Sequence, residues 1–205
     1  MLRKNRSPTT LKDYRPISLM HSFSKLFANC LARRLAPKLK LIVAPNQNAF
    51  IKDRSIHDNF RSVQLAYRWL HCKRFASVPL KIAIAKAFDS VAWAFLLEVL
   101  QFLGFPKRWT EWIAILLSTA STKVLLNGCP GRRIIHARGL RQGDAISPML
   151  FVIVIEALNA LIKEADRCNA LSPLPGRTIA HCASLYADDL VLLLIPRSED
   201  LDCLL

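Results

Sequence analysis

Two short apolar runs near the end of the chain flank an adjacent pair of acids. The runs cover residues 178–186 and 190–195, and Asp188 and Asp189 stand in the tight connection between them. Strands joined so closely form a hairpin, which places both carboxylates at its tip. Carboxylates side by side repel each other, and a divalent cation such as Mg²⁺ would relieve that repulsion. The alternative is that the pair only ends the hairpin, since Asp is a common turn residue.

The rest of the chain mixes helical and extended patterns. Apolar spacing predicts helices over residues 22–36, 57–74, 91–103, 107–117 and 147–167, a strand over 80–85, and a hairpin from 123–126 and 133–137 around Asn127-Gly128. We expect Pro37 to end or kink the first helix, and Ser90 and Ser147 to cap two others. Helices and strands do not alternate strictly, so the order predicts an α+β fold rather than a doubly wound sheet.

Positive charge is concentrated in the first part of the chain. The net charge is +14, and residues 1–80 hold 16 bases and 3 acids, whereas residues 81–205 hold 13 bases and 12 acids. Such asymmetry favours a chain whose first part binds a polyanion and whose second part has a different function. A solvated basic surface that only aids solubility is the alternative.

Membrane and secretory classes are not indicated. The longest apolar run, residues 149–162, carries Glu156 and is shorter than the roughly 18 residues of a membrane span. The basic start leads into polar residues, unlike a signal peptide. The six cysteines form no C-x-x-C pair, so we expect reduced core thiols in a cytosolic or nuclear protein.

Two further blocks carry residues suited to chemistry. The block from Gly139 to Asp144 has two glycines, which allow a close backbone approach to a ligand, and Arg141 and Gln142, which supply hydrogen-bond donors. Taken alone, it is a loop that leads into a capped helix. The block from Lys81 to Asp89 is a short strand that runs into a helix, and by itself indicates a plain core strand.

Taken in chain order, these three blocks resemble the polymerase motifs of non-LTR (LINE-type) retrotransposon reverse transcriptases, most nearly of the plant kind. The resemblance also covers residues 11–19 and 47–59, with every block in family order up to Asp189. It implies a right-hand polymerase fold, with basic fingers over about residues 1–80 and a palm over about residues 81–205. The palm would hold a small antiparallel sheet packed on helices.

The resemblance also implies the reaction and its partners. A primer 3′-hydroxyl would attack the α-phosphate of a deoxynucleoside triphosphate, on an RNA template with a DNA primer and with two Mg²⁺ ions. Asp188 would be a catalytic metal ligand, with Asp189 beside it. Lys12 and Arg15 would lie near the triphosphate, and Phe88 would be an aromatic gate against a 2′-hydroxyl. Gln142 and Gly143 would lie against the template and the nucleotide.

One departure from the family pattern bears directly on this chemistry. The family places a metal-binding aspartate two residues after the position of Lys81, where this chain has Ala83. Asp89 lies six residues further, about 20 Å along an extended strand, and Lys86 has the wrong charge. We therefore predict that this copy polymerises very poorly or not at all.

Lesser departures agree with that prediction. Ala145 replaces a usual proline, and Asp53 replaces a common glycine. Only Pro196 to Leu205 follow the acidic hairpin, so we expect a C-terminally truncated copy without a thumb. Three hypotheses follow: a reverse-transcriptase domain that is inactive or nearly so, a non-enzymatic nucleic-acid-binding module, and a retroelement remnant without function.

Overall fold

The chain forms two compact units, each built from two stretches of sequence. The computed structural model describes residues 21–172 and 183–196, together with Leu2, Arg3, Thr9, Tyr14, Arg15 and Leu174. The first unit combines residues 1–33 with 88–147, and the second combines residues 34–87 with 148–205. Each unit contains residues from both sides of residue 80, so the division into fingers and palm stays a prediction.

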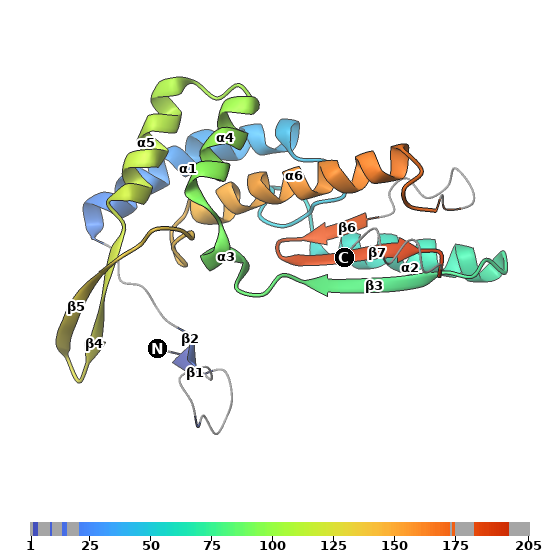
Figure 1. Cartoon of the computed structure of the whole chain (residues 1–205), viewed down its shortest axis with the longest axis horizontal. Helices are drawn as coiled ribbons and strands as arrows, with labels where there is room; N and C mark the ends of the chain where they lie inside the picture. Colours follow the sequence, from blue (N-terminus) through green and yellow to red (C-terminus); the bar gives the residue numbers. More distant parts are fainter. Residues whose placement is uncertain are drawn as a thin grey trace. The chain divides into compact units, whose positions relative to one another are not determined.

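Helices and small antiparallel sheets make up both units (Figure 1), which confirms the α+β fold. The helices are α1 (Ser22–Ile42), α2 (Ile56–Cys72), α3 (Ala87–Ser90), α4 (Trp93–Phe102), α5 (Lys107–Ser118) and α6 (Ser147–Arg167). The strands are β1 (Leu2–Arg3), β2 (Tyr14–Arg15), β3 (Val78–Ala83), β4 (Ser121–Leu126), β5 (Cys129–Ile135), β6 (Ala183–Tyr186) and β7 (Asp189–Leu194).

The second unit is organised around a three-stranded sheet of order β3-β7-β6, drawn in green and red in Figure 1. Directly opposed residues of antiparallel strands share a face. One face carries leucines that are almost fully buried: Leu185, Leu190 and Leu192. The end of the opposite face near the turn carries Asp189 and Tyr186, both only half-buried, whereas Leu193 further along that face is buried. The acidic end of the sheet is therefore accessible, while its apolar face forms core.

The first helix is longer than the sequence predicted, because it continues through Pro37 to Ile42. A proline inside a helix removes one backbone hydrogen bond. Leu35, Leu39 and Val43 follow one another at four-residue spacing and are all buried. We infer that the burial of this apolar stripe offsets the lost bond. Of the two predicted effects of Pro37, an end of the helix was wrong, and a kink stays a prediction.

The predicted cap at Ser90 was also wrong. Ser90 ends the short helix α3, and α4 begins at Trp93 after Ala92, which makes no side-chain cap. The Val91 carbonyl accepts a hydrogen bond from the Gly139 N–H at 2.8 Å. Because the Val91 carbonyl bonds to Gly139 instead of to a helical N–H, the regular helix starts two residues later than its apolar pattern suggests.

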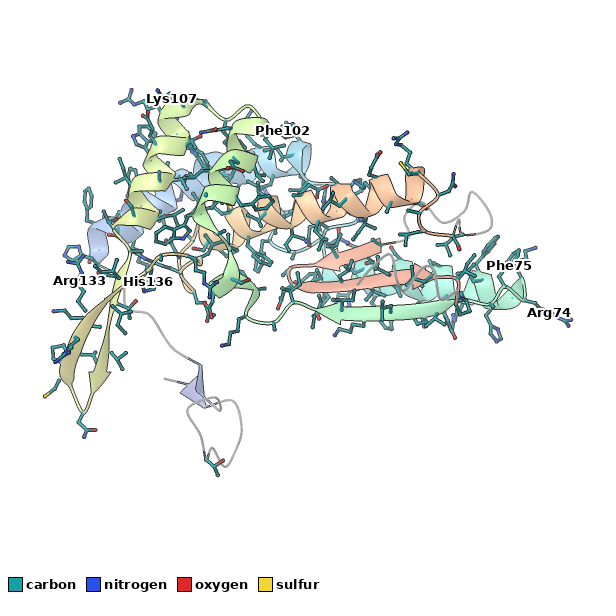
Figure 2. All side chains as sticks on the ribbon, viewed as in Figure 1. Arg74, Phe75, Phe102, Lys107, Arg133 and His136 are labelled. Carbon is teal, nitrogen blue, oxygen red and sulfur yellow. The ribbon has the colours of Figure 1, made fainter. Side chains whose placement is uncertain are left out.

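Other elements of the first unit follow the predicted signals. The β4–β5 hairpin turns at Asn127 and Gly128, which have φ of 49° and 82°. Two consecutive positive φ values are typical of the tight turn that an Asn-Gly pair favours. In Figure 2, Phe102 marks the end of α4 and Lys107 the start of α5. The chain between them passes through Gly104, whose φ of 76° suits a helix end.

The cysteines correct one expectation. The four cysteines in the described part of the chain (Cys30, Cys72, Cys129 and Cys168) are free thiols, as expected, but all are exposed rather than in the core. Cys182 and Cys203 lie outside the described residues. Among the described helices, none is both long and apolar enough to cross a bilayer.

Candidate active site

The acidic pair lies at the tip of the β6–β7 hairpin in the second unit. Tyr186 pairs with Asp189, so the connection consists of Ala187 and Asp188 alone, and Asp189 is already the first residue of β7. Ala187 has a φ of 53° and is 7% exposed. A left-handed conformation is uncommon for alanine, which makes this turn a strained one held by its surroundings.

Position 83 faces this tip across the sheet. Ala83 is the direct partner of Asp189 in the antiparallel register of β3 and β7, and its side chain is exposed. One residue further, the Ile84 N–H donates to the Asp188 carbonyl at 3.2 Å. Opposed side chains in such a pair have Cβ atoms about 4.5–5.5 Å apart. Ala83, at the position where the resemblance implies an aspartate, therefore lies beside Asp188 and Asp189.

A lysine supplies the positive charge next to Asp189. The Lys81 Nζ lies 3.2 Å from the Asp189 Oδ1, with the two side chains 65% and 49% exposed. Lys81 pairs with Val191, two residues beyond Asp189, so it reaches the acid diagonally across the same face. An ion pair this exposed contributes little to stability. Its consequence is electrostatic, because it neutralises an oxygen that a metal ion would need.

These side chains do not make up the donor set of a two-metal site. Mg²⁺ prefers carboxylate oxygens at about 2.0–2.1 Å in an octahedral arrangement. Asp188 and Asp189 offer two carboxylates, Ala83 offers none, and Lys81 competes for one of the oxygens. Among the described residues, no group of three or more His, Cys, Asp or Glu side chains is placed to hold a metal ion. The chemistry of the donors therefore fits Mg²⁺ poorly.

The glycine-containing block lies in the first unit, and its start is fixed to the chain around α3. The Leu140 N–H donates to the Phe88 carbonyl at 2.7 Å, and the Trp93 Nε1–H donates to the Gly139 carbonyl at 2.8 Å. A Cβ on Gly139 would lie 2.8 Å from the Asp89 carbonyl oxygen, too close for any side chain. Glycine is therefore required there for backbone packing, as well as for its φ of 86°.

The predicted nucleotide-binding residues differ in how much the structure says of them. Gln142 and Gly143 are exposed at the tip of this block, and Phe88 is half-buried. The backbone of Arg15 pairs with Leu2. Lys12 lies outside the described residues. Their roles toward a nucleotide stay predictions.

Asp144 closes the block as a buried acid. Its side chain is 5% exposed, and burial raises the pKa of its carboxyl, while the Ile146 N–H and the charge of Arg141 act to lower it. A raised pKa means that the ionised carboxylate destabilises the folded state. This destabilisation disappears as the pH falls through the folded-state pKa.

We therefore expect Asp144→Asn to raise the melting temperature near neutral pH, because asparagine keeps an acceptor oxygen without the buried charge. The difference between variant and wild type should shrink as the pH is lowered toward about 4, the range of an ordinary Asp. Calorimetric melting curves over this range measure both. Asp166→Asn, at an exposed position on α6, is the matched control. A variant that melts lower at neutral pH would contradict the prediction.

Asp53, at a position where the resemblance implies glycine, has a backbone conformation that suits glycine. Its φ is 65°, in the left-handed region that glycine adopts without cost and Asp tolerates. The Lys40 Nζ lies 2.6 Å from its Oδ2, and this hydrogen bond and charge hold the pKa of the Asp53 carboxyl below its usual range. The substitution is thus accommodated locally.

Sequence reasoning missed one set of residues near the acidic turn. Residues 47–56 were used only for the resemblance and Asn46 not at all, yet Gln47 bonds the turn itself and Asn46 bonds β6. The run of three amide side chains, Asn46, Gln47 and Asn48, was the available signal. Such amides are expected to find partners when they are buried.

Known protein families give an independent comparison. The sequence model described as "Reverse transcriptase (RNA-dependent DNA polymerase)" matches residues 2–205. A Pol polyprotein from the type-2 retrotransposable element R2DM of Drosophila melanogaster is 30% identical over 88% of this chain. A Pol polyprotein from the element R2 of Popillia japonica is 29% identical over 94% of it, and a transposon TX1 protein of Xenopus laevis is 28% identical over 94%.

These relatives are much longer than the region of likeness. The aligned region spans 16%, 26% and 14% of their respective lengths. The likeness therefore concerns one domain of a larger polyprotein. The relatives named here come from insects and a frog, so the plant kind stays a prediction.

Proposed function

This chain belongs to the reverse transcriptase family, as a domain of the non-LTR retrotransposon type, and we propose that it has lost most of its catalysis. The inherited reaction is nucleotidyl transfer. A primer 3′-hydroxyl attacks the α-phosphate of a deoxynucleoside triphosphate, and pyrophosphate leaves. An RNA template and a DNA primer are the proposed partners.

The observation that supports the loss is the pairing of Ala83 with Asp189. The carboxylates of Asp188 and Asp189 remain on one strand and its turn, while the facing strand offers a methyl group. Removing a residue that only orients a metal ligand already costs about 10–100-fold in metal affinity or activity. Removing a ligand itself should cost more, and the Lys81 ammonium adds competition for Asp189.

Primer extension by the wild-type chain tests this proposal. With an RNA template, a DNA primer and either Mg²⁺ or Mn²⁺, we expect extension close to background. Extension at the rate of an ordinary polymerase, at about 1 s⁻¹ or faster, would contradict it. A buffer without divalent ions gives the baseline.

Nucleic-acid binding is a second candidate function, supported by the exposed lysine and arginine side chains of α1. Lys25, Arg33, Arg34 and Lys38 are all exposed, and within the described residues no acid lies at ion-pair distance from them. Lys40, by contrast, is paired with Asp53. Unpaired cations on a helix surface are available to phosphates.

We expect single-stranded RNA to bind with an affinity that falls steeply with salt, by about 0.7 log units per contacted phosphate for each log unit of salt. Arg34→Gln combined with Lys38→Gln should make the slope of log affinity against log salt concentration shallower by about 1.4, as expected when each side chain contacts one phosphate. Fluorescence anisotropy at several salt concentrations measures it. Lys107→Gln, which removes a lysine 4.0 Å from Glu111, is the control. A slope near zero for the wild type would rule out this function.

Localisation in the nucleus or the cytoplasm accords with both functions. The four described cysteines are free thiols, as is usual in reducing compartments. Nucleic-acid templates and nucleotides are found in the same compartments.

A further inference from the structure

The loop between α1 and α2, residues 43–55, pairs with the outer edge of the sheet in the second unit. The Leu185 N–H donates to the Asn46 carbonyl at 2.8 Å, and the Asn48 N–H donates to the Leu185 carbonyl at 3.2 Å. Gln47 and Leu185 thus form a parallel bridge. This places the Gln47 side chain next to the acidic turn.

Gln47 bonds the turn directly. Its side chain is 1% exposed, and its Oε1 accepts hydrogen bonds from the Ala49 N–H at 2.9 Å and the Ala187 N–H at 3.2 Å. Only the amide oxygen can accept from two backbone donors, which fixes the orientation of the amide group. Gln47 therefore joins the loop to the residue immediately before Asp188.

The bond acts where the backbone needs support. Ala187 holds a φ of 53°, which costs energy for any residue with a Cβ. On the other side of Asp188, its carbonyl accepts from the Ile84 N–H at 3.2 Å. The backbone of Asp188 is thus fixed on one side by Gln47 and on the other by β3, which limits the directions its carboxylate can take.

Arg54 holds Gln47 in place in turn. Its guanidinium Nη1 donates to the Gln47 carbonyl at 2.6 Å and to the Ala44 carbonyl at 2.7 Å. Asn46 adds a second anchor, because its Nδ2 donates to Asn159 of α6 and to the Ala183 carbonyl of β6. The loop is therefore a rigid support for the turn.

The burial of Gln47 is not explained by packing alone. Among the described residues its Nε2 has no hydrogen-bond partner, and leaving a buried amide donor unmet is costly. An apolar side chain would avoid that cost but would leave the N–H groups of Ala49 and Ala187 without their acceptor. The glutamine at this position is therefore explained by its amide oxygen, which accepts from these two N–H groups.

We propose that Gln47 is a positioning residue for the acidic turn: it fixes the Ala187 peptide and thereby directs the Asp188 carboxylate. Gln47→Met keeps a similar volume and removes the acceptor, whereas Gln47→Glu keeps an acceptor. Gln64→Met, the same substitution at an exposed position of α2, is the matched control.

Amide hydrogen exchange tests the proposal in the chain as it is. In Gln47→Met, the Ala49 and Ala187 amides should exchange about tenfold faster, beyond any change at the β7 amides, as expected for one lost hydrogen bond. In Gln47→Glu they should stay protected relative to β7. Equal acceleration at Ala187 and throughout β7 would overturn the proposal. If the Met variant does not fold, Gln47→Ala gives the same comparison.

Activity gives a second test, which rests on the proposed function. In the Ala83→Asp background, Gln47→Met should lower kcat by about tenfold or more and change the KM for nucleotide less, as expected for a misdirected catalytic group. Unchanged kcat would count against Gln47. If Ala83→Asp itself is inactive, the assignment of the lost catalysis to position 83 fails, while the exchange result still decides the role of Gln47.

Discussion

Ala83→Asp is expected to raise primer extension by at least about a thousandfold, equivalent to about 4 kcal/mol of transition-state stabilisation. The register supplies the physical reason. A carboxylate at position 83 would stand directly opposite Asp189, across a pair whose Cβ atoms are about 4.5–5.5 Å apart. Two carboxylates at that separation can share a divalent ion with oxygen distances of about 2.0–2.1 Å. The new acid would also compete for Lys81.

The measurement is single-nucleotide extension of a DNA primer on an RNA template, run beside the wild type. Ala83→Asn is the matched control, since asparagine has the shape of aspartate but is a much weaker metal ligand. Ala83→Asp combined with Asp188→Asn should return extension to background. Equal rates for the Asp and Asn variants, with both folded by circular dichroism, would show that position 83 does not complete a metal site.

Phe151→Ala is expected to cause the largest loss of stability, about 3–5 kcal/mol in the free energy of unfolding. Phe151 lies on α6, is 1% exposed, and is among the largest fully buried side chains of the described residues. Its removal leaves a cavity that the surrounding structure can fill only partly. Native domains have about 5–15 kcal/mol in total, so this loss is a large part of the stability. For a chain of this size, the same loss should lower the melting temperature by about 6–20 °C.

Leu161 on the same helix gives the comparison. It is 69% exposed, so Leu161→Ala should change the free energy of unfolding by less than about 0.5 kcal/mol. Denaturant titrations of both variants measure the difference. Similar losses for both would mean that the buried face of α6 is assigned wrongly.

Local signals predicted most of the elements. The Asn127-Gly128 turn, the end of α4 before Gly104, and α6 from Ser147 to Arg167 all lie where the sequence placed them. Each depends on residues within a few positions, such as a glycine at positive φ or an apolar stripe at helical spacing. Such rules act within one turn or one helix.

Predictions failed where distant contacts decide the outcome. Pro37 does not end α1, because buried leucines on either side outweigh one lost bond. Ser90 does not cap α4, because Gly139 engages the Val91 carbonyl. The same holds at the candidate site. Asp188 and Asp189 were found from their own neighbours, whereas the contact of Gln47 with Ala187 joins residues 140 positions apart.

The exposed position of Ala83 has a consequence for the fold. Exchanging a carboxylate for a methyl group on an open sheet face creates no cavity and leaves no buried donor unmet, and it removes a like charge opposite Asp189. Under the proposed function, a substitution at this position can therefore remove the reaction while the fold is kept.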